Sequence, residues 1–500
     1  MTRKTAPVPS APNAEATSPE HQKLPIPTAF AYGIQHVLTM YGGIIAPPLI
    51  VGSAAGLKGP DLALLITSCL FIGGLATLLQ TLGIKWFGSQ LPLVQGTSFA
   101  SVATLLAIIN GGGGLPAIFG AVMAASLIGL IVAPFFAKVI HFFPPVVTGV
   151  VITTIGLSLV PVAANWSLGG NAKAPNYGDP ANIGLTALTL VIIMLLSKLG
   201  SGMISRLSIL LSIVIGTVIA AVVGKADFSQ VFNGPIFAFP QPFHFGLPTF
   251  EPAGIISMVI VVLVILTETT ADILAVGEVT GAKVDSKRIA NGLRADMLSS
   301  AVSPVFNGFT QSAFAQNVGL VAVTGIKSRF AVAAGGVVLV LLGLLPVLGR
   351  VVAAVPMPVL GGAGIVLFGT VAASGIRTLA KVDYKDSMNL IIVATSIAFG
   401  LVPVVSPTFY SKFPTWVQVI FDSGISSAAI MAVLLNILFN VIKSGNPKSS
   451  PSVFAAAPTR LIPLVVLDAL EDGDRIENGK IYDRDGNEVD IEASGGSHDH

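Results

Sequence analysis

Long apolar blocks recur along this chain, separated by glycine, proline and a few charged residues. Most are roughly 18 to 25 residues long, the length an α-helix needs to cross a hydrocarbon layer of about 30 Å. Only 10% of the 500 residues are charged and 53% are hydrophobic, whereas about a quarter of the residues in soluble domains are charged. A membrane β-barrel would show short alternating segments instead, so the pattern predicts an all-α polytopic membrane protein.

The blocks predict fourteen transmembrane segments. They are expected near residues 28–51, 62–83, 91–109, 115–136, 144–163, 183–199, 206–223, 253–277, 289–305, 313–325, 330–349, 358–376, 388–405 and 416–442. With both termini in the cytoplasm, thirteen of the 27 Lys and Arg residues fall in inward-facing loops, nine in the tails and five outside. Because cytoplasmic loops carry the excess of Lys and Arg, this distribution favours an even number of segments and cytoplasmic termini.

Fourteen segments divide into two seven-span repeats that would be inverted relative to one another. Matching segments in the two halves, Gly96–Ala100 in span 3 and Gln311–Ala315 in span 10, are short and rich in small and polar residues. Unwound segments at corresponding places in two halves indicate a mid-membrane binding site, since irregular backbone at that depth is tolerated only where it is buried or lines a cavity. We therefore expect short strand-like stretches in both spans.

Two carboxylates lie deep in the eighth apolar block. Glu268 and Asp272 are four residues apart, which places both on one helix face. Ionisable groups at membrane depth usually serve a pathway, and two adjacent acids at low dielectric cannot both ionise cheaply. We expect this pair to hold one proton near neutral pH; the structural alternative is a satisfied hydrogen-bond cluster. Glu278 and Asp296 are also within or near spans, and Glu278 can simply be solvated.

Polar and aromatic side chains in other spans are further candidates. Gln316 carries both a carbonyl and an NH2 group and can pair with the edge of a planar ligand, whereas Asn317 and Thr324 are expected to join helices. Phe99 can stack on a flat heterocycle or belong to the core. His36 can titrate or donate a hydrogen bond, and a neutral, satisfied histidine is equally open.

Four motifs together resemble one family. Gln316-Asn317-x-Gly319, followed by Thr324 and Gly325, is similar to the signature of the nucleobase-ascorbate transporters, also called the xanthine/uracil permease family. Three further segments resemble other family hallmarks in the same order: Gln35-His36, Gln95–Phe99 and Glu268–Glu278. The resemblance covers about residues 25–445. It implies a core domain sliding against a gate domain, commonly in a homodimer; the core would comprise 25–136 and 253–349, and the gate 137–252 and 350–445.

The resemblance also implies roles for individual residues. Glu268 would hydrogen-bond the base and Gln316 its other edge, while Phe99 would stack on it and the backbone near Ala315 would contribute. Gln at position 316 is typical of members that take oxidised purines, whereas uracil-selective members resemble one another in having Glu.

Further implied roles concern proton coupling and support. Coupling would involve Glu268 and Asp272 together with His36 and Asp296. Ser98, a small residue that leaves room for uric acid as well as xanthine, would support the site together with Asn317 and Thr324.

These observations predict a proton-coupled symporter that imports xanthine and/or uric acid across the cell membrane by an elevator-like mechanism. Uracil or another nucleobase, sodium as the coupling ion, and a related-fold anion transporter remain alternatives. A membrane enzyme is disfavoured because no His/Cys ligand cluster, nucleophile elbow or phosphate loop is apparent. No metal or cofactor other than the proton is expected, and the net charge of +2 gives no sign of a nucleic-acid partner.

The two ends of the chain differ from the apolar middle. Residues 1–24 are polar and lack a signal-peptide core, so a disordered cytoplasmic tail is expected. Residues 446–500 are expected to form an acidic cytoplasmic tail. A calcium loop at Asp472 and Asp474, or at Asp483 and Asp485, is disfavoured because the glycine at the sixth position is missing.

Overall fold

The computed structural model describes residues 18–136, 143–384 and 387–442, and in the C-terminal tail 475–477, 480–482, 484 and 488–489. The predictions for residues 1–17 and for the calcium-loop positions Asp472, Asp474, Asp483 and Asp485 lie outside the described residues. In the tail, β3 (Arg475–Glu477), β4 (Lys480–Tyr482) and β5 (Glu488–Val489) form a small antiparallel sheet that the sequence analysis did not predict.

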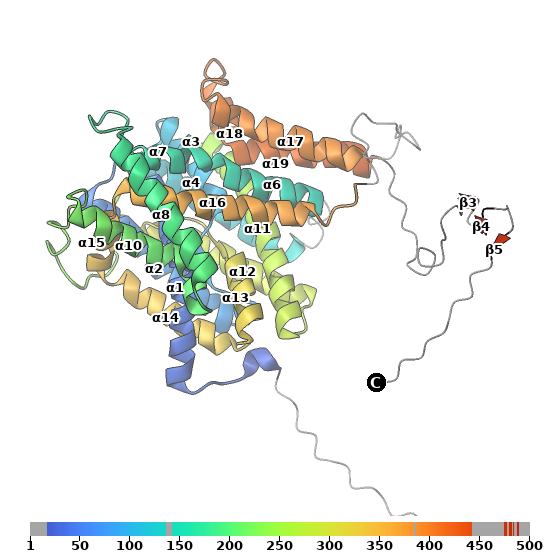
Figure 1. Cartoon of the computed structure of the whole chain (residues 1–500), viewed down its shortest axis with the longest axis horizontal. Coiled ribbons are helices and arrows are strands. Elements are labelled where there is room, and N and C mark those ends of the chain that lie inside the picture. The colour runs from blue at the N-terminus through green and yellow to red at the C-terminus, as the bar shows by residue number, and fades with distance from the viewer. Residues whose placement is uncertain are drawn as a thin grey trace, which may run out of the picture. The chain divides into compact units, whose positions relative to one another are not determined.

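Helices account for nearly all of the remaining secondary structure (Figure 1). Those of the first half are α1 (Ile26–Ala54), α2 (Gly59–Leu82), α3 (Phe99–Asn110), α4 (Gly114–Val132), α6 (Pro145–Ser158), α7 (Val160–Ser167), α8 (Pro180–Leu199), α9 (Met203–Arg206) and α10 (Ser208–Val222). Those of the second half are α11 (Pro252–Thr280), α12 (Ser286–Val302), α13 (Ala315–Thr324), α14 (Arg329–Gly343), α15 (Pro346–Ala353), α16 (Met357–Leu379), α17 (Ser387–Val405), α18 (Thr415–Phe421) and α19 (Gly424–Asn436). Short single turns are η1 (Pro19–His21), η2 (Ala133–Phe135), η4 (Ser303–Phe306) and η5 (Ile437–Val441). Many helices have proline in the first turn, where its missing N–H costs no helical hydrogen bond.

Nine helices within the described part of the chain are long and apolar enough to cross a membrane, or ten if α14 and α15, bent by 79°, form one broken span. They are α1, α2, α4 with η2, α6 with α7, α8, α11, α16, α17, and α19 with η5. The multi-pass, mainly helical prediction is confirmed. Each of the fourteen predicted blocks contains a helix, but several of these helices, α3 and α10 among them, are too short to meet the same test.

Two buried strands lie among the helices. β1 (Gln95–Thr97) pairs antiparallel with β2 (Gln311–Ala313), with Gly96 opposite Ser312. The expected strand-like stretches in these two segments are confirmed. α3 begins directly after β1 and α13 directly after β2, so the two helices leave opposite ends of the ladder. Gly96 is required because a Cβ atom there would lie 2.5 Å from the ring of Phe314.

Close helix contacts fall into two groups. In the first, α1, α2 and α14 pack together and α4 packs on α11 and α12. In the second, α16 packs on α6, α7, α8 and α10, and α19 packs on α6; Figure 1 shows α6 and α16 side by side. Glycines set the spacing within both groups: a Cβ at Gly74 would lie 2.5 Å from Val340 N, and one at Gly375 would lie 2.3 Å from Thr153 N. Small residues let helix backbones approach closely in membranes.

Candidate functional site

The predicted acid pair lies in the middle of α11. Glu268 is half-buried, whereas Asp272 is 7% exposed. Asp272 lies within electrostatic range of Glu268 and of Asp296 from α12. Its Oδ2 atom accepts no hydrogen bond from any described residue. The structure therefore gathers the carboxyl groups of Glu268, Asp272 and Asp296, which we call the acid cluster. Asp272 has an oxygen that is available for a proton or a hydrogen-bond donor.

Asp296 is held from two directions. Its Oδ1 accepts a hydrogen bond from Gln80 Nε2 at 3.2 Å, and its Oδ2 accepts one from the hydroxyl of Thr269 at 2.6 Å. Thr269 follows Glu268 in α11, and its oxygen also lies 3.5 Å from the N–H of Ala313 in β2. Thr269 thus connects the acid cluster to the strand that leads into α13. Sequence reasoning missed Gln80 and Thr269 because nothing in their local sequence identifies their partners.

Ala315 and Gln316 occupy the first turn of α13. Ala315 is half-buried and Gln316 is exposed. No hydrogen bond among the described residues uses the amide of Gln316, so both its donor and its acceptor are available. Because α11 contacts both β2 and α13, this amide and the acid cluster belong to adjoining elements.

Phe99 is the first residue of α3, which leaves the ladder of β1 and β2 at the end opposite to α13. It is 9% exposed and meets Phe368 of α16 edge to face, with ring centroids 6.2 Å apart. Ser98, one residue earlier, caps α3 by accepting the N–H of Ala100. A Cβ at Gly43 of α1 would lie 3.8 Å from the ring of Phe99 and 3.0 Å from that of Phe314.

Phe314 is therefore a second aromatic ring near Phe99. Sequence reasoning did not single it out, although Phe99-Ala100 and Phe314-Ala315 occupy the same place in the two matching segments. That correspondence was the signal from which it could have been found.

His36 is a satisfied, buried histidine. Its Nδ1 atom lies 3.0 Å from Oδ1 of Asn317, and the Asn317 NH2 group donates to the carbonyl of Pro92. Because the acceptor oxygen of Asn317 faces the ring, His36 Nδ1 carries the proton. Asn317 thus joins α1 to α13, as expected of an interhelical residue.

Thr324 differs from its prediction. Its hydroxyl donates to the carbonyl of Leu320 at 2.7 Å, within α13, and not to another helix. A threonine hydroxyl reaches the carbonyl four residues earlier without any tertiary contact.

Glu278 is exposed, in agreement with its solvated interpretation.

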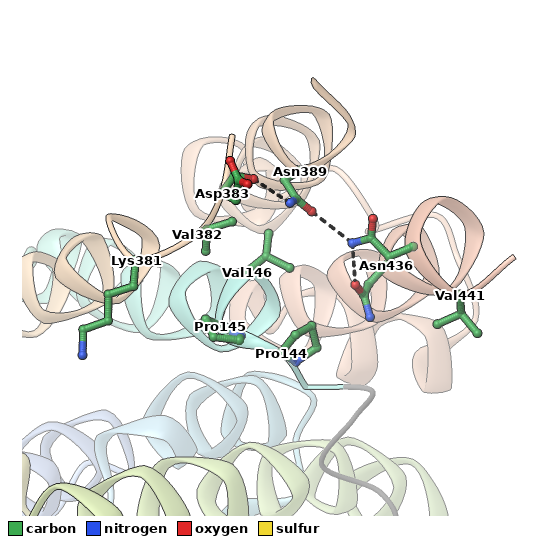
Figure 2. Close-up of a pocket in the computed structure, with 10 residues that line it drawn as sticks. Pro144, Pro145, Val146, Lys381, Val382, Asp383, Asn389, Asn436 and Val441 are labelled. Carbon is green, nitrogen blue, oxygen red and sulfur yellow. Dashed lines mark hydrogen bonds between the residues drawn. The ribbon is translucent and has the colours of Figure 1, made fainter. Parts of the chain in front are cut away.

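A cavity of about 420 Å³ lies elsewhere, at the ends of α6, α16, α17 and α19 (Figure 2). The NH2 group of Asn440 donates there to Asn389 at 3.0 Å and to Asn436 at 2.9 Å. None of the predicted site residues lines this cavity. Among the described residues, no group of three or more His, Cys, Asp and Glu side chains is arranged to hold a metal ion.

Comparison with known sequences gives the family. A model described as the Permease family matches residues 27–409. This chain belongs to the xanthine/uracil permease family. It is 41% identical to the uric acid transporter UacT of Escherichia coli (strain K12) over 82% of this chain and 85% of that protein. It is also 41% identical to the xanthine permease of Bacillus subtilis (strain 168), over 82% of this chain and 93% of the relative. This permease is a transporter and not an enzyme.

Solved structures with the same fold are more distant in sequence. The transmembrane domain of the cyanobacterial bicarbonate transporter BicA superposes with a TM-score of 0.55 at 17% identity, covering 81% of this permease and 96% of that chain. The murine anion transporter Slc26a9 gives a TM-score of 0.58 at 15% identity, covering 83% and 69%. These likenesses concern the fold alone.

Proposed function

We propose that this permease is a proton-coupled symporter that imports xanthine, uric acid or both across the cell membrane. The observation that carries the proposal is the gathering of Glu268, Asp272 and Asp296 against the strand that leads into Gln316. The names of the relatives, which are uric acid and xanthine permeases, support the same substrate class.

Recognition of the base uses groups from both halves of the chain. Gln316 offers a donor and an acceptor to one edge of a planar oxidised purine, and Glu268 pairs with another edge. The N–H groups of Ala315 and Gln316, at the start of α13, would face polar atoms of the ligand, whereas the N–H of Asn317 already donates to the carbonyl of Phe314. Phe99 stacks on the ring, and Ser98 leaves space beside it. Each hydrogen bond to a charged group contributes about 1.5 to 3 kcal/mol, which is enough to select a base and still release it.

Proton coupling uses the acids of α11. Holding several negative charges close together at low dielectric is costly, so a proton shared between Glu268 and Asp272 stabilises the loaded site. Asp296 has both oxygens engaged and fixes the geometry, while Asp272 retains an unpartnered oxygen. His36 supports proton coupling through its hydrogen bond to Asn317.

The proposed architecture has fourteen spans in two inverted seven-span repeats, with both termini cytoplasmic. Antiparallel pairing of β1 with β2, each followed by a short helix, supports the inverted relation. The core domain (25–136 and 253–349) would slide against the gate domain (137–252 and 350–445) in an elevator-like cycle, within a homodimer. Tight glycine packing inside each helix group supports two bodies that move as units.

Competition against labelled xanthine uptake tests the proposal. Xanthine, uric acid, uracil, guanine and adenine are supplied in turn to cells that lack their own carriers, with and without a protonophore. Xanthine and uric acid should compete strongly, uracil should not, and the protonophore should abolish accumulation. Competition by uracil alone, or accumulation that survives the protonophore, would contradict the proposed substrate or the proposed coupling respectively.

A further inference from the structure

Four buried hydroxyl groups meet where α3, α11 and α19 come together. The oxygen of Thr104 lies 2.8 Å from that of Ser423 and 3.4 Å from that of Ser426, and the oxygen of Ser257 lies 3.2 Å from that of Ser426. All four residues are fully buried. Ser423 also caps α19 by accepting the N–H of Ser426. We call these four residues the hydroxyl cluster.

The hydroxyl cluster crosses the boundary between the two proposed bodies. Thr104 and Ser257 belong to the core, whereas Ser423 and Ser426 belong to the gate. Within each body, glycines bring backbones so close that separation would leave voids. A contact between hydroxyl groups differs from a glycine contact, because either hydroxyl can donate the hydrogen bond. When the helices separate, water can take the place of the lost partner. A contact of this kind can open and close repeatedly at small cost.

Two helices, α11 and α3, carry both members of the hydroxyl cluster and predicted binding residues. Ser257 lies eleven residues before Glu268 in α11, which is about 16 Å along the helix axis. Thr104 lies five residues after Phe99 in α3. On the other side of Glu268, exposed residues recur at each turn of α11, at Ala271, Leu274 and Glu278.

The exposed positions of α13 follow the same pattern. Gln316, Gly319 and Val323 are exposed and recur along one face of that helix. The predicted binding residues therefore adjoin exposed positions toward the Glu278 end of α11. Toward the end where α11 begins, Ile256 is exposed, but Ser257 and the other members of the hydroxyl cluster are fully buried.

We propose that the hydroxyl cluster is a latch that closes the substrate site on the side of the membrane where α11 begins, and that it opens once in each transport cycle. This inference rests on the proposed function, in which the core moves against the gate. α3 carries both Phe99, which would stack on the base, and Thr104 of the hydroxyl cluster. Movement of α3 would therefore displace Phe99 and open the latch at the same time.

Reversible cross-linking tests the latch. Cys69 is the single cysteine of the chain, so Cys69→Ala gives a background without other thiols. In that background Thr104→Cys and Ser423→Cys are combined, and disulfide formation is scored by mass spectrometry after oxidation. The cross-link should form and lower labelled xanthine uptake by about tenfold or more, and reduction should restore it. Cross-linked protein that transports as fast as reduced protein would overturn the latch.

A matched pair within one body provides the control. The hydroxyls of Ser197 in α8 and Ser208 in α10 lie 3.0 Å apart, and both helices belong to the proposed gate. Ser197→Cys with Ser208→Cys should cross-link equally well and leave uptake at the level of the reduced protein. Equal loss of uptake in this control would show that any bridge at such a distance blocks transport, which would also overturn the latch.

A second measurement needs no transported purine. Ser101, buried one turn before Thr104, is replaced by cysteine in the Cys69→Ala background and labelled with a membrane-impermeant thiol reagent. Thr104→Val removes the hydroxyl group and keeps the shape of the side chain. It should raise the rate of thiol labelling about fivefold, which corresponds to the loss of one hydrogen bond. Thr104→Ser keeps the hydroxyl group and should leave the labelling rate unchanged. Unchanged labelling in Thr104→Val contradicts the latch. If labelling responds as expected but no purine is taken up by the parent, the substrate proposal fails and the latch stands.

Discussion

The hydroxyl of Thr269 donates a 2.6 Å hydrogen bond to the carboxylate of Asp296, 27 residues further along the chain. This contact joins α11 to α12 directly beside Glu268. Because the same hydroxyl oxygen faces the N–H of Ala313, one side chain sets the spacing between the acid cluster and β2.

Removing that hydroxyl should impair transport without touching the substrate. We expect Thr269→Val to lower proton-driven xanthine uptake by about tenfold, because a hydrogen bond to a charged group contributes about 1.5 to 3 kcal/mol. Thr269→Ser keeps the donor and should restore both the rate and the pH profile of uptake. A valine variant with the parent's rate and pH profile would show that Thr269 has no positioning role.

Replacing Glu268 by Gln should abolish coupled uptake, since the amide cannot release and take up a proton. Accumulation of labelled xanthine is measured with and without a protonophore. Glu278→Gln is the matched control, because Glu278 is exposed on the same helix, and it should retain uptake. Undiminished proton-driven accumulation by the Glu268 variant would refute its assigned role.

Gln316→Glu should weaken xanthine uptake, because the carboxylate has lost the NH2 donor that pairs with the purine. Loss of one such bond raises the KM by roughly tenfold or more. Competition by uracil is measured in parallel, since Glu at this position resembles the uracil-selective members. An unchanged KM for xanthine would mean that the exposed amide does not contact the base.

Asn317→Leu should destabilise the protein through His36. The buried imidazole loses its acceptor and the carbonyl of Pro92 loses its donor, and each orphaned group costs about 1 to 3 kcal/mol. Thermal unfolding in detergent should show a clearly lower Tm. Asn233→Leu, at an exposed position, serves as the control and should leave the Tm unchanged. Equal melting of the two variants would contradict the interhelical role.

Two glycines of α16 allow a matched test of helix packing. A Cβ at Gly375 would lie 2.3 Å from the backbone N of Thr153, whereas one at Gly369 would meet nothing within 4 Å. Gly375→Ala should therefore destabilise the protein by about 1 to 3 kcal/mol through overpacking, and Gly369→Ala should not. The measurement is the Tm of each variant in detergent; equal values would show that α6 and α16 can separate at no cost.

Much of the fold was predictable because membrane helices are specified locally. The apolar block at 253–277 corresponds to α11 at Pro252–Thr280, and the unwound segments at Gly96 and Ser312 correspond to the paired strands. The position of Glu268 and Asp272 within a long apolar helix also followed from the sequence, because the apolar block around them is long enough to span a bilayer. The tail sheet was missed because its strands of two or three residues give no periodic signal.

The partners of the polar side chains were not predictable in the same way. Nothing in the sequence around Thr269 points to Asp296, and the interhelical role expected for Thr324 was wrong because its own helix supplies an acceptor. Phe314 was overlooked although its segment had been aligned with that of Phe99. Each of these outcomes depends on which helices pack together.

Hydropathy was enough to identify a multi-pass membrane protein with two non-helical segments and with acids inside a long apolar helix, since each apolar block is specified by its own residues. The tertiary structure alone decided that Asn317 holds His36, 281 positions away, and that Thr104 meets Ser423, 319 positions away. Hydropathy is a property of a stretch of chain, whereas a hydrogen bond requires two groups within about 3 Å, and only the packing of distant helices brings them to that separation.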